Sequence, residues 1–177
     1  MMTVGHSTLG IEPFLLALSD NSVKVLVDVR RFPGSKRHPQ FSQAALFDSL
    51  ERIGIRGVWR EALGGRRPPA KESVNTGWKN ESFRGYADYM QTEAFAREIE
   101  WLAGLPEQEH AVVMCAESLP WRCHRSLIAD ALLARGVEVD DLFVKADGAS
   151  HLKPHRMTSF AQVRNGHVLY PKEPVLF

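Results

Sequence analysis

The chain of 177 residues has 44% hydrophobic and 24% charged side chains, a composition typical of one globular domain with a sizeable core. Its formal net charge of +1 excludes a global attraction to nucleic acid, so anion binding must come from local clusters of arginine. No apolar run could cross a bilayer and no leader pattern opens the sequence, so we expect a cytoplasmic protein without a membrane partner. Two cysteines do not make a disulfide framework, and we expect them to be thiols, metal ligands or catalytic groups.

The first thirty residues contain two strand patterns separated by a helix pattern. A β-type run over 3–5 is followed by apolar residues at helical spacing over 11–18. Residues 23–29 are almost continuously apolar and β-branched, which is typical of a parallel strand covered on both faces. Asp28 interrupts this second strand near its carboxyl end.

A basic loop opens the next region. Residues 30–39 are too rich in proline and glycine for a helix, and their basic side chains make them a candidate phosphate-binding loop. A helix pattern over 42–53 and a third strand over 55–59 follow. Residues 64–82 show no clear period, and so long a connection predicts a mobile loop or lid.

The second half repeats the alternation of helix and strand. Residues 83–102 predict a helical region, and the apolar run over 111–115 predicts a strand that ends in a loop containing proline. A further helix begins just after His124, and residues 137–144 predict a strand that pairs beside 111–115. We expect residues 147–177 to form a C-terminal extension packed on the domain.

This alternation predicts a single α/β domain over residues 1–177, with a mostly parallel sheet and helices on both faces. Ligands of such sheets bind at the carboxyl ends of the strands. The loop that follows residues 111–115 collects both cysteines, a carboxylate, a histidine, an indole and two arginines, a mixture that core packing does not require. We therefore predict that chemistry takes place at this loop.

The two cysteines differ in their expected surroundings. Cys115 ends a buried strand, where it is either a packed apolar residue or a functional thiol. Cys123 lies at the start of a helix, and the helix dipole together with Arg122, His124 and Arg125 should favour its thiolate. Cysteine phosphatases place five residues between cysteine and arginine, whereas six separate Cys115 from Arg122, which disfavours that chemistry.

Acid–base candidates come from three separate segments. Glu117 is either a solvated loop carboxylate or a general acid or base, with Asp28 as the second carboxylate of a hydrolytic arrangement. His6 ends the first strand, and its ring should point into the same crevice as Cys115. The alternative for His6 is a histidine that caps a turn.

Arginine gives the clearest binding signal, because eight arginines fall in predicted loops or at helix starts. Their position after strands predicts one crevice that binds phosphate oxygens, with Tyr86, Trp78 or Trp121 offering a face to a nucleobase. Surface salt bridges and core packing are the alternatives for these arginines and aromatics. The eight are Arg30, Arg31, Arg37, Arg66, Arg67, Arg84, Arg122 and Arg125.

Several short motifs are spread along nearly the whole chain, and an LYP sequence at 169–171 lies near its end. The motifs are TVGHS (3–7), VDVR (27–30), LGGRR (63–67), FRGYADYM (83–90), and MCAE with PWRCHRS (114–126). Together they resemble the bacterial and archaeal family called domain of unknown function 488. The resemblance implies a compact cytoplasmic α/β domain, and it implies no activity.

The residues leave three functional hypotheses open. The first is a hydrolytic enzyme acting on a nucleotide or nucleic acid, in which arginines bind phosphate, Glu117 or Asp28 moves protons, and a cysteine lines the pocket. The second is thiol or sulfur transfer at Cys115 or Cys123, because Asp28 and Arg30 with a loop cysteine are faintly similar to rhodanese-type sulfur carriers. The third is a non-catalytic module that binds nucleic acid.

No cofactor and no metal ligands are expected, with zinc as the alternative. His6, Cys115, Cys123 and His124 have the ligand types of a structural zinc site. Seven residues separate the two cysteines, however, whereas zinc knuckles usually have about two to four. The oligomeric state stays open.

Overall fold

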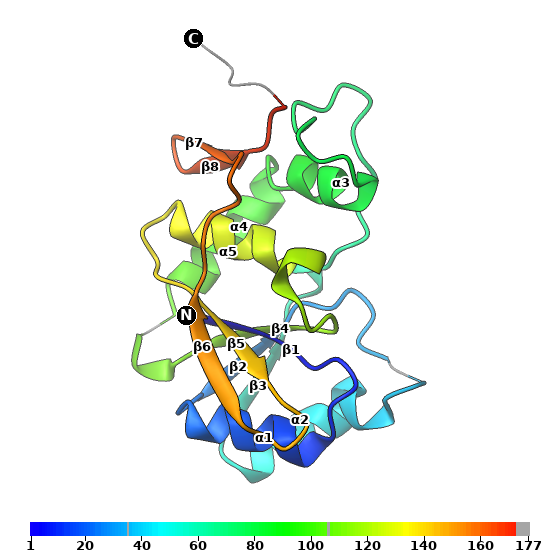
Figure 1. Cartoon of the computed structure of the whole chain (residues 1–177), viewed down its shortest axis with the longest axis vertical. Helices are drawn as coiled ribbons and strands as arrows, with labels where there is room; N and C mark the ends of the chain where they lie inside the picture. Colours follow the sequence, from blue (N-terminus) through cyan, green and yellow to red (C-terminus); the bar gives the residue numbers. More distant parts are fainter. Residues whose placement is uncertain (35, 106, 173–177) are drawn as a thin grey trace.

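A six-stranded sheet in the order β3-β2-β4-β1-β5-β6 lies at the centre of the computed structural model, which describes residues 1–34, 36–105 and 107–172 (Figure 1). The first five strands run parallel, and β6 is antiparallel to β5. The mostly parallel sheet predicted from the sequence is therefore confirmed. The strands are β1 (Met2–Gly5), β2 (Val25–Asp28), β3 (Arg56–Trp59), β4 (Val112–Cys115), β5 (Asp140–Val144) and β6 (Ser150–Pro154).

Helices cover both faces of this sheet, as predicted (Figure 1). Helices α1 (Ile11–Asp20) and α2 (Gln43–Arg52) lie on one side, which we name the α1 face. Helices α3 (Glu81–Tyr89), α4 (Glu93–Ala103) and α5 (Arg125–Leu133) lie on the other, the α5 face. In the described parts of the chain, no helix combines the length and apolar character needed to cross a membrane.

Shorter elements complete the fold. The helical region predicted over 83–102 is two helices, because the Thr92 hydroxyl accepts a hydrogen bond from Phe95 N and starts α4 anew. A small hairpin of β7 (Gln162–Arg164) and β8 (His167–Leu169) lies on the same side of the sheet as α3, α4 and α5 (Figure 1). The 3₁₀ turns are η1 (Pro39–Phe41), η2 (Glu61–Leu63), η3 (Glu107–Glu109) and η4 (Pro120–Arg122).

Each face of the sheet has its own core, because neighbouring residues of a strand point to opposite sides. On β4, Val113 and Cys115 belong to the core of the α5 face. Val112 and Met114 belong to the core of the α1 face. This double coverage explains why the central strands are almost continuously apolar.

The position of β1 corrects one expectation. The strand predicted over 137–144 does not pair beside 111–115, because β1 lies between β4 and β5 and pairs with both. The chain leaves β1 toward α1 and leaves β4 toward α5, so these neighbouring strands send their helices to opposite faces. Such a switch point, at the carboxyl ends of the strands, is where open α/β sheets bind ligands.

Two long segments are tied to the domain through polar side chains. Asp88 of α3 accepts hydrogen bonds from Ala70 N, Ser73 Oγ and Asn75 Nδ2, so part of the 64–82 connection is anchored there. Its mobility stays a prediction. In the C-terminal extension, Tyr170 is buried and donates through its backbone N–H to Asn75. Residues 173–177 of that extension lie outside the described residues.

Candidate functional site

Some of the residues predicted from the sequence form two clusters at the carboxyl edge of the sheet, on opposite faces, and the others are dispersed. Gly5 of β1 is the register partner of Cys115, so the next residue, His6, points to the other face. The His6 ring stacks on Phe41, with 4.2 Å between ring centroids, on the α1 face. Cys115 packs on the α5 face. The structure thus separates His6 from Cys115, against the expectation of one crevice.

On the α1 face, Arg30 is fully engaged by the chain itself. Its Nε and Nη2 donate to the two carboxylate oxygens of Asp28 at 2.9 and 2.6 Å, and its Nη1 donates to the carbonyl of Phe41 at 2.7 Å. Arg30 is 6% exposed and Asp28 is fully buried. Asp28 therefore serves as the counter-ion of Arg30, which leaves it poorly suited to the role of general base.

His6 is neutral in this environment. Its Nδ1 lies 3.0 Å from the carbonyl of Ser7 and its Nε2 lies 3.3 Å from Nη1 of Arg30, so the network assigns a donor Nδ1–H and an acceptor Nε2. Burial and the positive charge of Arg30 lower the pKa of His6 from 6.5 to about 4. The imidazole therefore adds no positive charge to the site at neutral pH.

A pocket of about 530 Å³ opens beside this cluster, and we name it the arginine pocket. It brings together four of the predicted site residues, namely His6, Arg30, Arg37 and Glu117. Sequence reasoning missed the two hydroxyl residues of the lining, Ser7 and Thr8. Ser7 has a positive φ of 47°, a backbone conformation that only the structure reveals. Besides the four, the lining includes Ser7, Thr8, Phe32, Lys36, His38 and Ala116.

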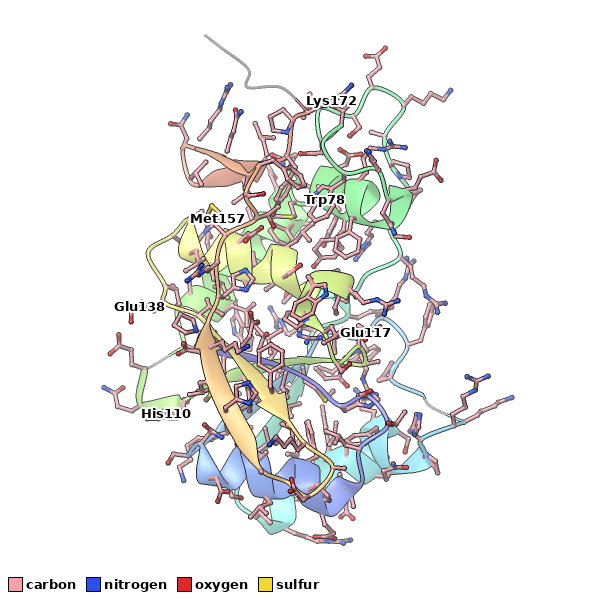
Figure 2. All side chains as sticks on the ribbon, in the orientation of Figure 1. Trp78, His110, Glu117, Glu138, Met157 and Lys172 are labelled. Atoms are coloured by element: carbon pink, nitrogen blue, oxygen red, sulfur yellow. The ribbon has the colours of Figure 1, made fainter. Side chains whose placement is uncertain are left out.

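Glu117 stands on the wall of this pocket, in the loop that follows β4 (Figure 2). Its Oε1 accepts weak hydrogen bonds from Ser118 Oγ at 3.3 Å and Leu119 N at 3.5 Å. The loop passes so close to β1 that a Cβ at Gly5 would lie 1.8 Å from the carbonyl oxygen of Glu117. Glycine at position 5 is what allows this approach.

On the α5 face, Cys115, Cys123 and His124 form a second group, the sulfur cluster. The sulfurs of Cys115 and Cys123 lie 4.0 and 3.9 Å from Nδ1 of His124. Both cysteines are free thiols, 8% and 5% exposed. The loop after β4, which contains η4, brings these two cysteines, eight positions apart in the sequence, close together.

The pKa values of the two thiols are shifted in opposite directions. A hydrogen bond from the Cys115 thiol lowers the pKa of Cys123 well below its usual value, and His124 and Arg125 act in the same direction. The same hydrogen bond, together with burial, raises the pKa of Cys115. Burial opposes ionisation of Cys123, but the hydrogen bond and the neighbouring cations outweigh it, so these contacts favour a thiolate at Cys123.

A sequence model described as "Domain of unknown function DUF488" matches residues 10–132. The chain belongs to this family. No curated protein and no solved structure matches the chain significantly. The DUF488 match spans β2, β4 and α5, so it contains both the Arg30–Asp28 pair and the sulfur cluster.

Several arginines of this DUF488 domain bind their own backbone instead of lining the arginine pocket. Arg125 is buried and donates to the carbonyls of Glu117 and Ser118, which fixes the loop after β4. Arg67 donates to the carbonyls of Ala62 and Gly64.

The remaining predicted binding residues are also dispersed. Arg31 donates to the carbonyl of Arg66, and Arg84 lies 3.5 Å from Glu81 on α3. Tyr86 is buried and donates to the carbonyl of Leu63, so it offers no free face to a nucleobase. Arg122 and Trp121 lie in the η4 turn, outside the arginine pocket.

A third polar group, which the sequence reasoning missed, joins Asp130, inside the DUF488 match, to two residues beyond it. His155 is hydrogen-bonded through Nδ1 to Asp141 at 3.0 Å and through Nε2 to Asp130 at 3.1 Å. Burial alone would lower the pKa of His155, but the two carboxylates raise it to about 9. The one sequence signal was Asp130, a charge inside an apolar helical run.

This group borders a cavity of about 690 Å³ beside β5 and β6. Trp78 and Met157, labelled in Figure 2, line it together with Trp121, Asp141 and His155. Trp121 is 63% exposed, so its indole faces this cavity and solvent. The predicted stacking residues Trp78 and Trp121 thus lie at a different place from the arginine pocket.

Proposed function

We propose that the protein is an enzyme that binds a phosphate-bearing small molecule, of the nucleotide class, in the arginine pocket and hydrolyses it. One observation carries the proposal: cationic and hydroxyl side chains and one carboxylate line a single pocket at the switch point between β1 and β4. Open α/β sheets bind their ligands at such a point.

The charge of the pocket comes mainly from its exposed rim. Asp28 neutralises Arg30, and His6 is uncharged at neutral pH, so Lys36 and Arg37 are the main source of positive charge among the described residues that line the pocket. Ser7 and Thr8 add hydroxyl donors from the end of β1. Cations combined with hydroxyl and backbone donors form the usual environment of a bound phosphate group.

The size of the pocket favours a small molecule over a nucleic-acid strand. Its volume of about 530 Å³ falls within the range of about 300–1,000 Å³ typical of small-molecule sites. The formal net charge of +1 adds no extended basic surface for a polymer.

Glu117 is the group best placed to move a proton. Among the described residues that line the arginine pocket, it is the one carboxylate. Asp28 is fully buried and bound by Arg30 at two oxygens, which disfavours it as a second acid or base. We assign Glu117 the role of general base toward water.

Sulfur transfer has weaker support as the main function, because neither cysteine lines the arginine pocket and both are buried.

A cytoplasmic location is part of the proposal. Two unpaired cysteines this close together fit a compartment that keeps thiols reduced.

Binding and turnover test the proposal separately. Calorimetry with nucleoside mono-, di- and triphosphates, inorganic phosphate and a short single-stranded oligonucleotide should show binding of nucleotides. Replacing Lys36 and Arg37 together by glutamine should weaken that binding by about tenfold or more. The control is Arg52→Gln, since Arg52 is exposed on α2 and pairs with Asp48.

For turnover, Glu117→Gln should retain nucleotide binding and lower phosphate release by about 100-fold or more. Equal affinity in the double variant would refute the assigned pocket. Unchanged turnover in Glu117→Gln would refute the role of the carboxylate.

A further inference from the structure

We propose that Cys115 Sγ, Cys123 Sγ and His124 Nδ1 form a binding site for one thiophilic divalent cation of the zinc class. The site lies on the α5 face and shares no residue with the arginine pocket. It therefore stands or falls independently of the proposed function.

The distances between the donor atoms fit a tetrahedral cation. Bonds of about 2.3 Å to sulfur and about 2.0 Å to nitrogen place a sulfur and a nitrogen ligand about 3.5 Å apart. In the structure, the two sulfurs lie 4.0 and 3.9 Å from Nδ1 of His124. All three donor atoms lie within 4.8 Å of one another. Two sulfur ligands of a tetrahedral cation lie about 3.8 Å apart, so shifts of up to about 1 Å would complete the coordination.

The backbone holds these ligands without a zinc knuckle. Cys115 is fixed by its pairing with Gly5 in the sheet, and Cys123 is fixed by Ser126, whose N–H and hydroxyl donate to its carbonyl at 3.1 and 2.9 Å. Arg125 binds two carbonyls of the intervening loop. The wide spacing in the sequence is thus bridged by a rigid loop, and His6, on the opposite face, is not part of the set.

Packing around His124 holds its ring with Nδ1 about 4 Å from both sulfurs. The ring lies 4.9 Å from the ring of Tyr86, centroid to centroid, which restrains its orientation. A Cβ at Gly65 would lie 2.9 Å from Nδ1, so the absence of a side chain there keeps space beside the donor atom. A side chain at position 65 would therefore crowd the proposed donor atom.

Two features set the kind of site. Among the described residues, no further histidine, cysteine or carboxylate joins the group, so three protein ligands leave a fourth position for water or another donor. Nε2 of His124 is buried and has no hydrogen-bond partner in the described part of the chain. Zinc-bound histidines usually have such a partner, so we expect weaker binding than in a closed structural site.

Cobalt titration of the reduced, chelator-treated full-length protein tests the site under anaerobic conditions. We expect one Co²⁺ per chain, with sulfur-to-cobalt charge-transfer absorption and d–d bands of tetrahedral coordination, and displacement of the cobalt by Zn²⁺. Cys115→Ala and Cys123→Ala should each abolish the charge-transfer spectrum or halve it, and His124→Gln should weaken binding by about tenfold or more.

Gly65→Ala is the sharpest variant, because it keeps every ligand and adds one methyl group beside Nδ1. It should weaken Co²⁺ binding by about tenfold, whereas the control Gly34→Ala, whose Cβ would meet nothing within 4 Å, should not. Circular dichroism of each apo variant controls for folding. Absence of sulfur-to-cobalt absorption in the wild-type protein would overturn the proposal, as would cobalt binding that survives loss of both cysteines.

Discussion

His6 and His155 are two buried histidines in clusters that contain aspartate, yet they differ in charge at neutral pH. His6 lies beside the Arg30–Asp28 pair at the arginine pocket, and its pKa is lowered to about 4. His155 lies between Asp130 and Asp141, and its pKa is raised to about 9. Burial acts in the same direction on both imidazoles, toward the neutral form.

The difference lies in what the aspartates bind. Asp28 is already occupied by the guanidinium of Arg30, so His6 meets the cation and not the acid. Asp130 accepts a hydrogen bond from the Tyr170 hydroxyl, and Asp141 accepts one from the Thr3 hydroxyl. Because these donors are neutral, they do not offset the attraction of the two carboxylates for a proton on His155. The charge of a buried histidine thus follows from the second partner of its neighbouring acid.

Removing the guanidinium should have the largest effect. Arg30→Met leaves the buried carboxylate of Asp28 without a counter-ion, and we expect a loss of about 3–5 kcal/mol in the free energy of unfolding, measured with urea. NMR titration should show the pKa of His6 moving up toward its usual value. Arg52→Met, at an exposed ion pair, should change stability by less than about 0.5 kcal/mol. An equal, small effect in both variants would contradict the role given to Arg30.

The fall in the free energy of unfolding at acid pH reports on the protonation of His6. Its pKa is about 4 in the folded chain and 6.5 when unfolded, so the unfolded state binds the extra proton and stability falls as the pH drops from 6.5 to 4. We expect wild type to lose about 3 kcal/mol more than His6→Gln over this range. Parallel curves would show that His6 is not held neutral by folding.

The alkaline limb isolates His155, with the opposite sign. Its pKa is about 9 in the folded chain and 6.5 when unfolded, so its contribution is complete below pH 6.5 and is lost as the pH rises to 9. We expect a loss of about 2 kcal/mol, reduced by partial solvent screening, that is missing in His155→Gln. A wild-type curve as flat as the variant's between these pH values would refute the charged state.

Much of the fold was predictable, because local patterns determine the elements. The apolar runs at β2 and β4 and the helical spacing in α1 and α5 correctly predicted a covered, mostly parallel sheet. The position of β1 between β4 and β5 was not predictable, because the residues of a strand do not determine which strands it pairs with. That same pairing decides which face each side chain occupies.

The sequence could only partly predict which of the candidate site residues lie together. The engagement of Arg30 by Asp28 was readable in principle, since residues two apart on a strand share a face. The separation of His6 from Cys115 depends on the register of Gly5 with Cys115, which no local signal encodes. The partnership of Asp130 with His155 joins residues 25 positions apart, and only folding brings them together.

Gly5 has a consequence for both clusters. Its backbone supports the carbonyl of Glu117, in the short loop whose far end leads through η4 to Cys123. A methyl group at position 5 would lift this shared segment off the sheet, shifting the carboxylate on one side and the thiol on the other. The absence of a side chain at Gly5 thus bears on the arginine pocket and on the sulfur cluster at once.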